Sequence, residues 1–521
     1  MTNNLDLRPL WAAQTIAVVG ATERVGAIGR LPIEYLTKFG FEGFIAPVNP
    51  KGGTILGLPA FQSMAEIPQH IELALIMVPA SSVREAVKDC AAAGVDVAIV
   101  MSSGFGEVDP DGQIAQQELV DIARADGMRL VGPNCIGSVG GAHRVMATFS
   151  PVFSSESTPL PAGNVALVSQ SGALGFGALS LGLERGVPIG IAITTGNEAD
   201  VTAVEVAAQL AQDPEVDAVA MYVESLGNMD QLIEVAGSKP IAILKAGRSV
   251  AGAAAAASHT GALASPDKVV SAVLTQNGIA RANNIDELLD IAALFASEKK
   301  ILGPAVGIVT TSGGSGILAV DALESEGLSL AELSAETVTA LEEIVPSYGN
   351  ATNPVDVTAA VMAESGLFER CVNRLSTDPS VNAIVACFAV LVGKDVDRIA
   401  QALGAVRENT GLPVVAVRTG AAALAPEGAQ VFKEAGIPVY PTPERAVAAL
   451  RALVTINTPE RKNLAPATQP GIPVPQKGAS EKDLKELFAQ AGLPIPESLV
   501  VTSGSDVVGA VGTVGGRAVF K

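Results

Sequence analysis

The sequence predicts an α/β fold built from parallel sheets with helices on both faces. Short apolar runs alternate with helical stretches from residue 15 onward, which is the pattern of repeated βαβ units. The composition is 48% hydrophobic with only 4% aromatic residues, and abundant Ala, Val and Gly suit buried strands under closely packed helices. Part of the chain also repeats itself. At 521 residues the chain is too long for one hydrophobic core, so we expect several domains.

The first α/β unit begins with an apolar strand that leads into a glycine turn and then a helix, TIAVVGATERVGAIGR (15–30). Four further strands are expected in GFIAPVNP (43–50), LALIMVP (73–79), VDVAIVMSSG (95–104) and MRLVGPNCIG (128–137). Helical stretches such as SSVREAVKDCAAAG lie between the runs, so the sheet should be parallel. The segment FSPVFSSESTPLPAG (149–163) is rich in Ser and Pro and is predicted to be a linker.

Beyond this segment, two copies of one α/β unit follow each other. The aligned pairs are VALVSQSG (165–172) with VGIVTTSG (306–313), DPEVDAVAMYVES (213–225) with DPSVNAIVACFAV (378–390), KPIAILKAG (239–247) with LPVVAVRTG (412–420), and NGIARANNIDE (277–287) with AGIPVYPTPER (435–445). The first copy is longer in one place. Gly247 and Gly278 are 31 positions apart, whereas Gly420 and Gly436 are 16 apart, and AAAAASHTGA (253–262) lies within the longer stretch.

A histidine and a carboxylate are therefore peculiar to the first copy. His259 lies in the added stretch, and Glu224 stands where the second copy has Ala389, at the end of a predicted strand, where open α/β sheets bind ligands. A neutral imidazole can act as acid, base, metal ligand or nucleophile; an exposed loop residue is the alternative. Glu224 could orient the ring through one nitrogen and leave the other free to attack. The other histidines, His70 and His143, are expected to be structural or surface groups.

Matching strand-to-helix turns occur in both copies, as SQSG (169–172) and TTSGGSG (310–316). If the copies pack about a pseudo-twofold axis, both helix N-termini could point at one anion. Each helix dipole would then contribute about 0.3–1 kcal/mol when exposed and up to ~2 kcal/mol when partly buried. Such a site would suit a phosphorylated histidine.

The glycine turn GATERVG (20–26) follows a strand and precedes a helix, so it could bind a phosphate. It is not G-x-G-x-x-G, and the second strand ends in VNPKGG (48–53) where an NAD site would want Asp or Glu. Lys51 in that motif suits a phosphorylated ribose, as in coenzyme A or NADP. A solvated turn residue at Lys51 and a packing role for Gly20 are the alternatives.

Charge and composition exclude several classes of protein. The formal net charge is −20, which disfavours nucleic acid and anionic membranes as partners. No uncharged apolar run reaches the ~18 to 20 residues that a membrane span requires, so we expect a cytoplasmic protein. The cysteines show no metal-ligand spacing, which makes disulfides and structural zinc improbable; they are Cys90, Cys135, Cys371 and Cys387.

The end of the chain contains a Pro-rich linker and a short α/β stretch. Residues 457–480 form the linker, and residues 481–521 give a helix, a turn, a strand, a second helix and then RAVFK. These last 41 residues are too few to bury a core. We therefore expect that they pack on other domains or begin a further domain.

Together these motifs resemble the NDP-forming (ADP-forming) acyl-CoA synthetases, relatives of succinyl-CoA synthetase, along the whole chain. They follow the family's order: the glycine turn with VNPKGG, then GPNCIG, SQSG, YVES, KAGRS followed by SHTG, GGSG and NPVD (353–356). The resemblance implies the reaction acid + CoA + ATP = acyl-CoA + ADP + phosphate, through an acyl phosphate and a phosphohistidine. The implied organisation is a Rossmann-like CoA-binding domain (1–148), a flavodoxin-like ligase domain with the phosphohistidine loop (158–298), a second flavodoxin-like ligase domain (300–456), the linker (457–480) and an incomplete ATP-grasp N-terminal segment (481–521).

Site residues follow from the matching motifs. His259 corresponds to the phosphohistidine and Glu224 to the glutamate that hydrogen-bonds it. The implied phosphate-binding residues are Ser171, Gly172, Ala173, Gly314 and Ser315. The implied coenzyme A-binding residues are Gly20, Thr22, Arg24, Gly26, Asn49, Lys51, Val78, Pro79, Ser103, Asn134 and Cys135. No base obviously pairs with Cys135, so we do not assign it as a nucleophile, and no metal ligands are expected.

The resemblance implies coenzyme A as a substrate, and ATP or ADP with Mg²⁺ at an ATP-grasp domain that this chain does not complete. Either the intact protein continues or a separate subunit supplies that domain. The small-molecule partner would be a carboxylic acid or its acyl-CoA, and the chain could form a homo-oligomer. Two other functions stay open. An NADP-dependent Rossmann oxidoreductase explains Lys51 but gives SHTG no role, and a non-catalytic CoA-binding regulatory module is disfavoured by the presence of His259 with Glu224.

Overall fold

A computed structural model describes most of the chain. The described residues are 6–254, 266–298, 300–362, 364, 366–389, 393–458, 480–490, 492, 495, 499, 501 and 503–513. The chain divides into two compact units, Met1–Glu460 and Arg461–Lys521. Helices α17 (Glu481–Gln490) and α18 (Val507–Thr513) and the 3-10 turn η6 (Gly504–Asp506) are described in the second unit. The chain end RAVFK lies outside the described residues.

The first sheet is parallel throughout, as the alternating pattern predicts. Its strands, in spatial order, are β2 (Phe44–Val48), β1 (Thr15–Val19), β5 (Leu73–Ile76), β6 (Val97–Val100) and β7 (Arg129–Val131). Its helices are α2 (Leu31–Lys38), α3 (Ala80–Ala92) and α4 (Pro110–Ala125), and a hairpin of β3 (Gly53–Ile55) and β4 (Leu58–Ala60) follows β2. Because β1 lies between β2 and β5, the connections change direction there, and ligands of such sheets bind at that switch point.

The second sheet combines parallel strands with an antiparallel edge. In spatial order it contains β14 (Ala280–Ala282), β13 (Ile241–Lys245), β12 (Ala218–Val223), β10 (Val165–Ser169), β11 (Ile189–Thr194), β8 (Gly137–Gly140) and β9 (Val145–Thr148). Its helices are α5 (Gly172–Glu184), α6 (Ala203–Leu210), α7 (Met229–Ser238), α9 (Asp267–Gln276) and α10 (Ile285–Ser297). Strands β8 and β9 thus hydrogen-bond into this sheet, although the domain division predicted from the sequence groups residues 137–148 with the first unit.

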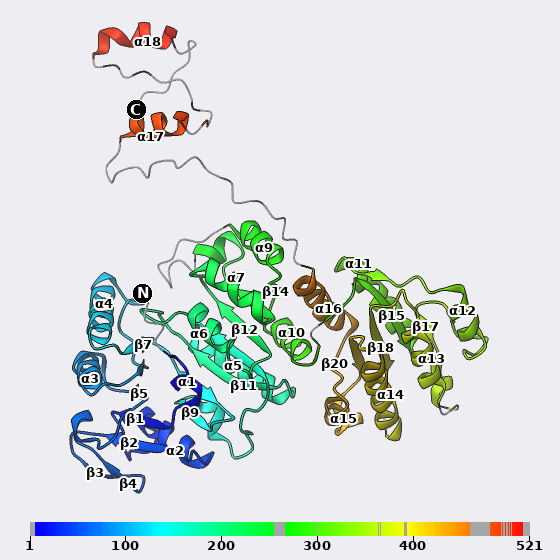
Figure 1. Ribbon diagram of the computed structural model, residues 1–521, viewed down its shortest axis with the longest axis horizontal. Coiled ribbons are helices and arrows are strands. Elements are labelled where there is room, and N and C mark those ends of the chain that lie inside the picture. The colour runs from blue at the N-terminus through cyan, green and yellow to red at the C-terminus, as the bar shows by residue number, and fades with distance from the viewer. Residues whose placement is uncertain are drawn as a thin grey trace. The chain divides into compact units, whose positions relative to one another are not determined.

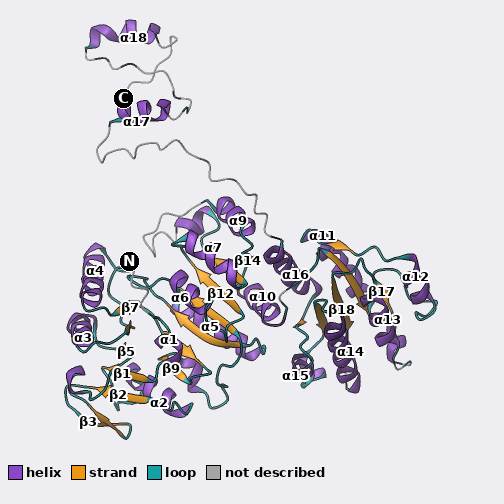
Figure 2. Ribbon diagram, viewed as in Figure 1, coloured by secondary structure: helices purple, strands orange, loops and turns teal. Residues whose placement is uncertain are grey.

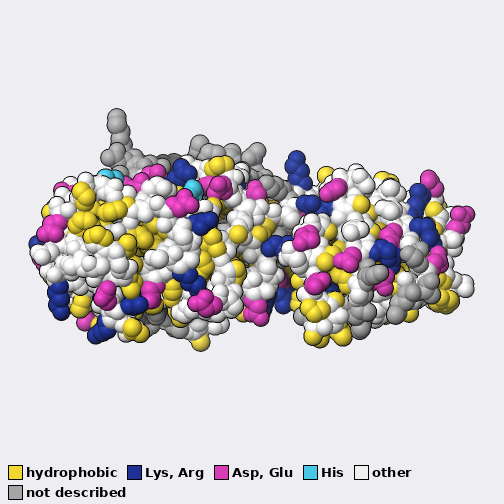
Figure 3. All heavy atoms as spheres, turned by 90° about the horizontal axis from the view of Figure 1, so that it is seen from below, with side chains coloured by type: hydrophobic (Ala, Val, Ile, Leu, Met, Phe, Trp, Pro, Cys, Tyr) yellow, Lys and Arg dark blue, Asp and Glu magenta, His cyan; other side chains and the backbone are white. Residues whose placement is uncertain are grey.

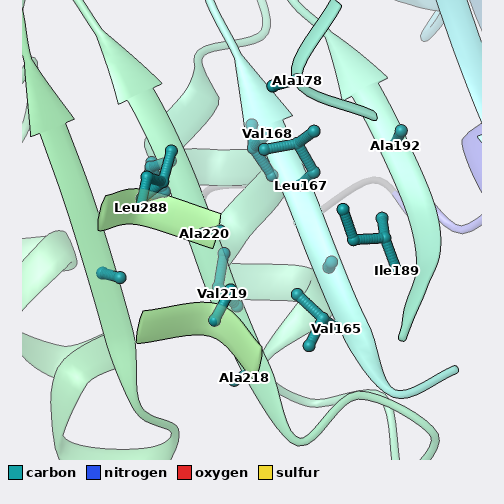
Figure 4. Packing of buried hydrophobic residues seen from close by; sticks show 14 of the residues in the cluster. Val165, Leu167, Val168, Ala178, Ile189, Ala192, Ala218, Val219, Ala220 and Leu288 are labelled. Carbon is teal, nitrogen blue, oxygen red and sulfur yellow. The ribbon is translucent and has the colours of Figure 1, made fainter. Parts of the chain in front are cut away.

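Helices cover both faces of the parallel strands in this sheet. Every residue of β10, β11 and β13 is buried, and Figure 4 shows Val165, Leu167 and Val168 of β10 packed among side chains of neighbouring strands. Such continuous burial is typical of parallel sheets between two helical layers. Polar side chains are therefore confined to the strand ends and loops.

The third sheet repeats the second in the same order. Its strands are β16 (Ser329–Leu330), β15 (Ala305–Thr310), β18 (Ala383–Ala389), β19 (Val414–Thr419) and β20 (Val439–Tyr440), with β17 (Val355–Asp356) paired to β15. Its helices are α11 (Gly313–Ser325), α12 (Ala335–Glu342), α13 (Leu367–Ser376), α14 (Lys394–Thr410), α15 (Gly428–Glu434) and α16 (Pro443–Asn457). Read from β14 to β11 and from β20 to β16, the strand orders of the two sheets match. Figure 2 shows that helices lie beside the strands in both copies. The predicted duplication is confirmed.

Equivalent helices of the two copies pack against each other. Helix α10 follows β14 in the first copy, α16 follows β20 in the second, and the two lie side by side (Figure 1). Arg445 of α16 forms a two-pronged ion pair with Asp290 of α10, at 2.5 and 2.6 Å. Contact between equivalent elements is what a pseudo-twofold relation produces.

Part of the predicted linker 149–163 is instead packed into the core. Residues 151–154 form the 3-10 turn η3 (Pro151–Ser154), and the Phe153 side chain is fully buried. Its ring contacts the rings of Tyr35 and Phe39 on one side and Phe176 of α5 on the other. The Ser/Pro composition predicted a break between strands, but it did not predict that Phe153 within this segment would be buried.

On the face shown in Figure 3, Lys and Arg side chains are scattered among Asp and Glu. The short helix α1 (Pro9–Ala12) precedes the first sheet. Among the described residues, no helix has both the length and the apolar character needed to cross a bilayer.

We predict that the α10–α16 ion pair stabilises the packing of the two copies. Burial raises the pKa of Asp290, and the Arg445 hydrogen bonds oppose this effect. Arg445→Met leaves the carboxylate unpaired, so the free energy of unfolding in urea at pH 7 should fall by about 3–5 kcal/mol. Without Arg445 the pKa of Asp290 should rise further. Protonation then relieves the buried charge, so the loss should shrink as the pH falls.

Two variants serve as controls for this prediction. Asp290→Asn combined with Arg445→Met should cost less than Arg445→Met alone, because no buried charge remains. Arg451→Met, which removes a half-exposed contact of the same helix with Glu326, should cost no more than about 1 kcal/mol. A loss that is the same in all three variants would contradict the assignment.

Candidate active site

The glycine turn after β1 brings two segments of backbone very close together. Gly20 has φ +94°, and a Cβ there would lie 2.6 Å from the carbonyl oxygen of Met77. Asn49, just after β2, donates from Nδ2 to the Ala21 carbonyl at 2.8 Å and accepts from the Lys51 amide at 2.9 Å. Gly20 therefore has a packing reason to be glycine, and Asn49 joins the turn to the end of β2.

The other residues predicted for coenzyme A stand at the same edge of the first sheet. Thr22, Arg24 and Gly26 lie in the turn after β1, Val78 and Pro79 follow β5, Ser103 follows β6, and Asn134 and Cys135 follow β7. The Arg24 and Lys51 residues are exposed. The structure thus brings the whole predicted set to the carboxyl edge of the first sheet, while its role in binding stays a prediction.

The loop after β7 has an unusual backbone. Asn134 has φ +61°, a left-handed conformation that costs energy in a residue with a Cβ. Its amide donates to Ser102 at 3.0 Å, and its Nδ2 donates to Asn197 Oδ1 at 3.3 Å. Cys135 is buried, and burial raises the pKa of its thiol to about 12. This thiol is therefore protonated near neutral pH, in keeping with leaving Cys135 out of the nucleophile assignment.

A turn after β11 holds this loop through backbone hydrogen bonds. The amides of Asn197 and Ala199 donate to the carbonyls of Pro133 and Gly132 at 3.0 and 3.1 Å. A Cβ on Gly196 would lie 2.3 Å from the Pro133 oxygen, so only glycine permits this approach. The first and second sheets are consequently connected at their carboxyl edges.

The N-termini of α5 and α11 have one equivalent hydrogen bond each, although only α5 has a side-chain cap. In the first copy the Ser169 hydroxyl donates to the Ser171 carbonyl at 2.7 Å, and in the second Thr310 donates to Ser312 at 2.7 Å. The Ser171 hydroxyl also accepts from the Leu174 amide at 3.4 Å and caps α5. Turns that place the first N–H groups of a helix at a strand end are suited to anion binding.

The predicted phosphate-binding residues occupy these two N-termini. Gly172 and Ala173 begin α5, and a Cβ on Gly172 would lie 2.7 Å from Ile136 Cγ1. Gly314 is exposed in the first turn of α11, whereas the Ser315 hydroxyl is buried beside the Cys387 thiol. A contact from Ser315 to an anion would therefore come from its backbone N–H.

Glu224 directly follows β12, as the sequence predicts. Its amide donates to Gln170 Oε1 at 2.5 Å. The pKa of Tyr222 is raised by burial and by Glu224. The pKa of the buried Lys245, at the end of β13, is lowered by burial and by Arg281, while Glu224 acts in the opposite direction. Glu224 therefore lies in a polar cluster at the carboxyl edge of the second sheet.

His259 lies outside the described residues, so its pairing with Glu224 stays a prediction. Of the other histidines, His70 forms an exposed pair with Asp96 at 2.8 Å. Within the described part of the chain, no group of three or more His, Cys, Asp or Glu side chains is arranged to hold a metal ion.

Sequence reasoning missed two residues beside Glu224. Gln170 hydrogen-bonds the Glu224 amide, and Glu198 hydrogen-bonds Gln170. Gln170 lies in the motif SQSG, in which the sequence predicted a role only for Ser171 and the helix N-terminus that follows. Glu198 has φ +55°, which no sequence pattern revealed because it is not a glycine.

Three family models match the chain in succession. A CoA binding domain matches residues 14–141, a succinyl-CoA ligase like flavodoxin domain matches 162–295, and a Ligase-CoA domain matches 306–457. Each match contains the parallel strands of one sheet. The fold and the order of these matches define a CoA-dependent ligase of α/β architecture.

The chain belongs to the family of ADP-forming acyl-CoA ligases. It is 36% identical to subunit alpha of ADP-forming acetate–CoA ligase I of Pyrococcus furiosus, over 86% of this chain and 97% of that protein. It is 27% identical to the ADP-forming 4-hydroxybutyrate–CoA ligase of Nitrosopumilus maritimus, over 98% of this chain and 75% of that protein. Acetyl-coenzyme A synthetase 1 of Candidatus Korarchaeum cryptofilum, in complex with phosphate and ADP, superposes with a TM-score of 0.78 at 30% identity, covering 87% and 97% of the two chains.

We predict that the cysteines do not react in the folded protein. All four are buried, and burial raises each thiol pKa to about 12. Only about one thiolate in 10⁵ would be present at pH 7. Native protein should therefore show almost no reaction with Ellman's reagent over an hour, whereas protein unfolded in urea should show four thiols. Rapid modification of Cys135 in the native protein would contradict this.

Proposed function

We propose that this chain carries out the acyl-transfer and phosphoryl-transfer steps of an ADP-forming acid–CoA ligase. The overall reaction is acid + CoA + ATP = acyl-CoA + ADP + phosphate. The observation that carries the proposal is the position of Glu224, which follows β12 and is hydrogen-bonded to the turn that begins α5. The carboxylate can orient an imidazole through a hydrogen bond. The N–H groups at the adjacent helix N-terminus can bind a phosphoryl group.

When the reaction starts from acyl-CoA, phosphate attacks the thioester carbon and the C–S bond breaks. The CoA thiolate leaves and takes up a proton. The product is an acyl phosphate. A ring nitrogen of His259 then attacks phosphorus, the P–O bond to the carboxylate breaks, and the free acid leaves. Finally the phosphoryl group passes from His259 to a β-phosphate oxygen of ADP, which forms ATP.

Coenzyme A would bind at the carboxyl edge of the first sheet. The proposed contacts are Gly20, Thr22, Arg24, Gly26, Asn49, Lys51, Val78, Pro79, Ser103, Asn134 and Cys135. The backbone N–H groups of the turn would face phosphate, and Lys51 and Arg24 would supply positive charge. The loop that holds Asn134 is hydrogen-bonded to the second sheet, which supports a thiol end directed towards the phosphate site.

The phosphoryl group on His259 would be held by backbone N–H groups at one helix N-terminus or at both. Ser171, Gly172 and Ala173 would act from α5, and Gly314 and Ser315 from α11. The packing of α10 on α16 supports a pseudo-twofold arrangement, in which equivalent helix ends approach a common axis. Glu224 would accept a hydrogen bond from the ring nitrogen that does not carry phosphorus.

The nucleotide would bind, with Mg²⁺, to an ATP-grasp domain supplied by a further segment or by a separate subunit. The 97% coverage of a protein named subunit alpha and the 75% coverage of the longer Nitrosopumilus ligase support this division. Residues 481–521 would belong to that domain. The acid would be a small carboxylic acid, and the chain would work in the cytoplasm.

The proposal predicts a phosphoenzyme that forms without nucleotide. Labelled inorganic phosphate is supplied with acetyl-, branched-chain, aromatic or dicarboxylic acyl-CoA, and acid-labile, base-stable label is measured on the chain. His259→Ala should abolish the label. Glu224→Gln should slow its formation by roughly 10- to 100-fold, because the ring loses its orienting carboxylate.

His143→Ala, which replaces a histidine outside the proposed site, is the matched control and should label like the natural chain. Absence of label with every acyl-CoA tested, or full labelling of His259→Ala, would contradict the proposed function.

Binding of coenzyme A gives a second prediction. CoA should raise the thermal unfolding temperature, whereas NADP at the same concentration should not. Lys51→Ala should weaken CoA affinity by up to about fivefold, the effect of losing an exposed charge contact of about 1 kcal/mol. Lys88→Ala, at an exposed pair with Glu85 on α3, should leave the affinity unchanged. A response to NADP alone would favour an oxidoreductase instead.

A further inference from the structure

The side chain of Gln170 uses both ends of its amide group at the edge of the second sheet. Its Oε1 accepts hydrogen bonds from the amides of Glu224 and Ser225, at 2.5 and 3.0 Å. Its Nε2 donates to Glu198 Oε2 at 2.7 Å and to the Ser225 carbonyl at 3.1 Å. One side chain thus holds the backbone at the point where Glu224 leaves β12.

Glu198 orients the Gln170 amide, so that Nε2 and not Oε1 faces the Glu198 side chain. Its other oxygen, Oε1, accepts from the Thr195 hydroxyl at 2.8 Å and from the Ala203 amide at 2.7 Å. Burial raises the pKa of Glu198. In its ionised form this carboxylate only accepts hydrogen bonds and requires the Gln170 NH₂ at Oε2, and the N–H groups of residues 224 and 225 require the Gln170 oxygen on the other side. The Gln170 oxygen is then directed to the two N–H groups of the Glu224 segment.

Glu198 also has a strained backbone. Its φ of +55° is a conformation that residues with a Cβ adopt at a cost, and one that persists where surrounding contacts fix it. The residue before it, Asn197, donates from its amide to Pro133, next to Asn134 of the predicted coenzyme A loop. One turn therefore contacts both the first-sheet loop and the residue that orients Gln170.

The second copy of the α/β unit provides an internal comparison. Gln170 donates from its amide to the Tyr222 carbonyl at 3.1 Å, and Thr311 donates to the Cys387 carbonyl at 3.0 Å. This equivalence places Thr311 opposite Gln170 and Ala389 opposite Glu224. The copy that lacks the carboxylate also lacks the amide that holds its backbone, so the two residues differ together.

From these contacts we infer that Gln170 is a positioning residue for Glu224, oriented by Glu198. The inferred role of both residues is exerted through the backbone of the Glu224 segment and not through a contact with substrate. Gln170 fixes the peptide units at residues 224 and 225, and these fix the direction in which the Glu224 carboxylate points. This inference rests on the proposed function for the role of Glu224, but the hydrogen bonds that it assigns to Gln170 can be tested without that function.

The test uses two complementary substitutions in the full chain. Gln170→Glu sets two carboxylates 2.7 Å apart, and Glu198→Gln sets an NH₂ group where an acceptor is required. The double variant restores one acceptor and one donor across the same contact. If the pair acts as inferred, each single variant should slow phosphate labelling from acyl-CoA by at least about tenfold, which corresponds to ~1.4 kcal/mol, and the double variant should recover most of the rate.

A second readout does not depend on activity. In each single variant, hydrogen exchange should speed up at the amides of residues 224 and 225, and the double variant should restore their protection. The thermal shift produced by CoA should be unchanged in Gln170→Glu, since the Gln170 side chain contacts residues 198, 224 and 225 and not the first-sheet loop. A general loss of structure would instead raise exchange throughout the sheet and reduce the CoA response.

Asn164 offers a matched control at the other end of the same strand. It precedes β10 and donates from Nδ2 to Asp217 Oδ2 at 2.7 Å, the same amide-to-carboxylate contact at the same distance. Asn164→Asp should lower stability to a similar degree as Gln170→Glu but should label at the natural rate. Slow labelling in Asn164→Asp would show that destabilisation alone is sufficient, and would overturn the inference.

The remaining outcomes separate the inference from the proposed function. If the natural chain labels and the single variants label equally fast with unchanged exchange at residues 224 and 225, the inference is wrong. It is also wrong if the double variant does not recover. If the natural chain does not label with any acyl-CoA, the proposed function fails, and hydrogen exchange still decides whether Gln170 and Glu198 hold the segment.

Discussion

The constraint on which the rest of the structure depends is the burial of the parallel strands on both faces. Strands β10, β11 and β13 have every residue buried, and a polar side chain in such a strand would lose hydration without a partner. Polar side chains are therefore found at strand ends. Glu224 after β12, Lys245 at the end of β13 and Gln170 after β10 all follow this rule.

The same constraint explains why the first two sheets are joined at their edges. The loop after β7 cannot pack into a sheet interior, so its carbonyls need donors elsewhere. They find them in the turn after β11, where Asn197 and Ala199 donate to the backbone. Because Gly196 lets the two segments approach within hydrogen-bond distance, the loop that carries Asn134 is directly connected to the carboxyl edge of the second sheet.

Most of the fold could be predicted because its signals are local. Apolar runs between glycine turns located the parallel strands, and the internal repeat located both ligase units, whose sheets have matching order. Glu224 was found by comparing the copies. The 149–163 segment was less predictable, since its composition gave no sign that Phe153 would be fully buried. Strands β8 and β9 join the second sheet through antiparallel pairing with β11, a long-range contact that sequence periodicity does not report.

The positioning residues could not be predicted for a different reason. Gln170 acts through hydrogen bonds to residues 54 and 28 positions away, and a neutral amide gives no charge pattern. The repeat nevertheless held the information, because Thr311 replaces Gln170 in the copy where Ala389 replaces Glu224. The second copy has no carboxylate at this position, so it needs no residue that positions one. Paired differences between internal copies therefore identify supporting residues as well as reactive ones.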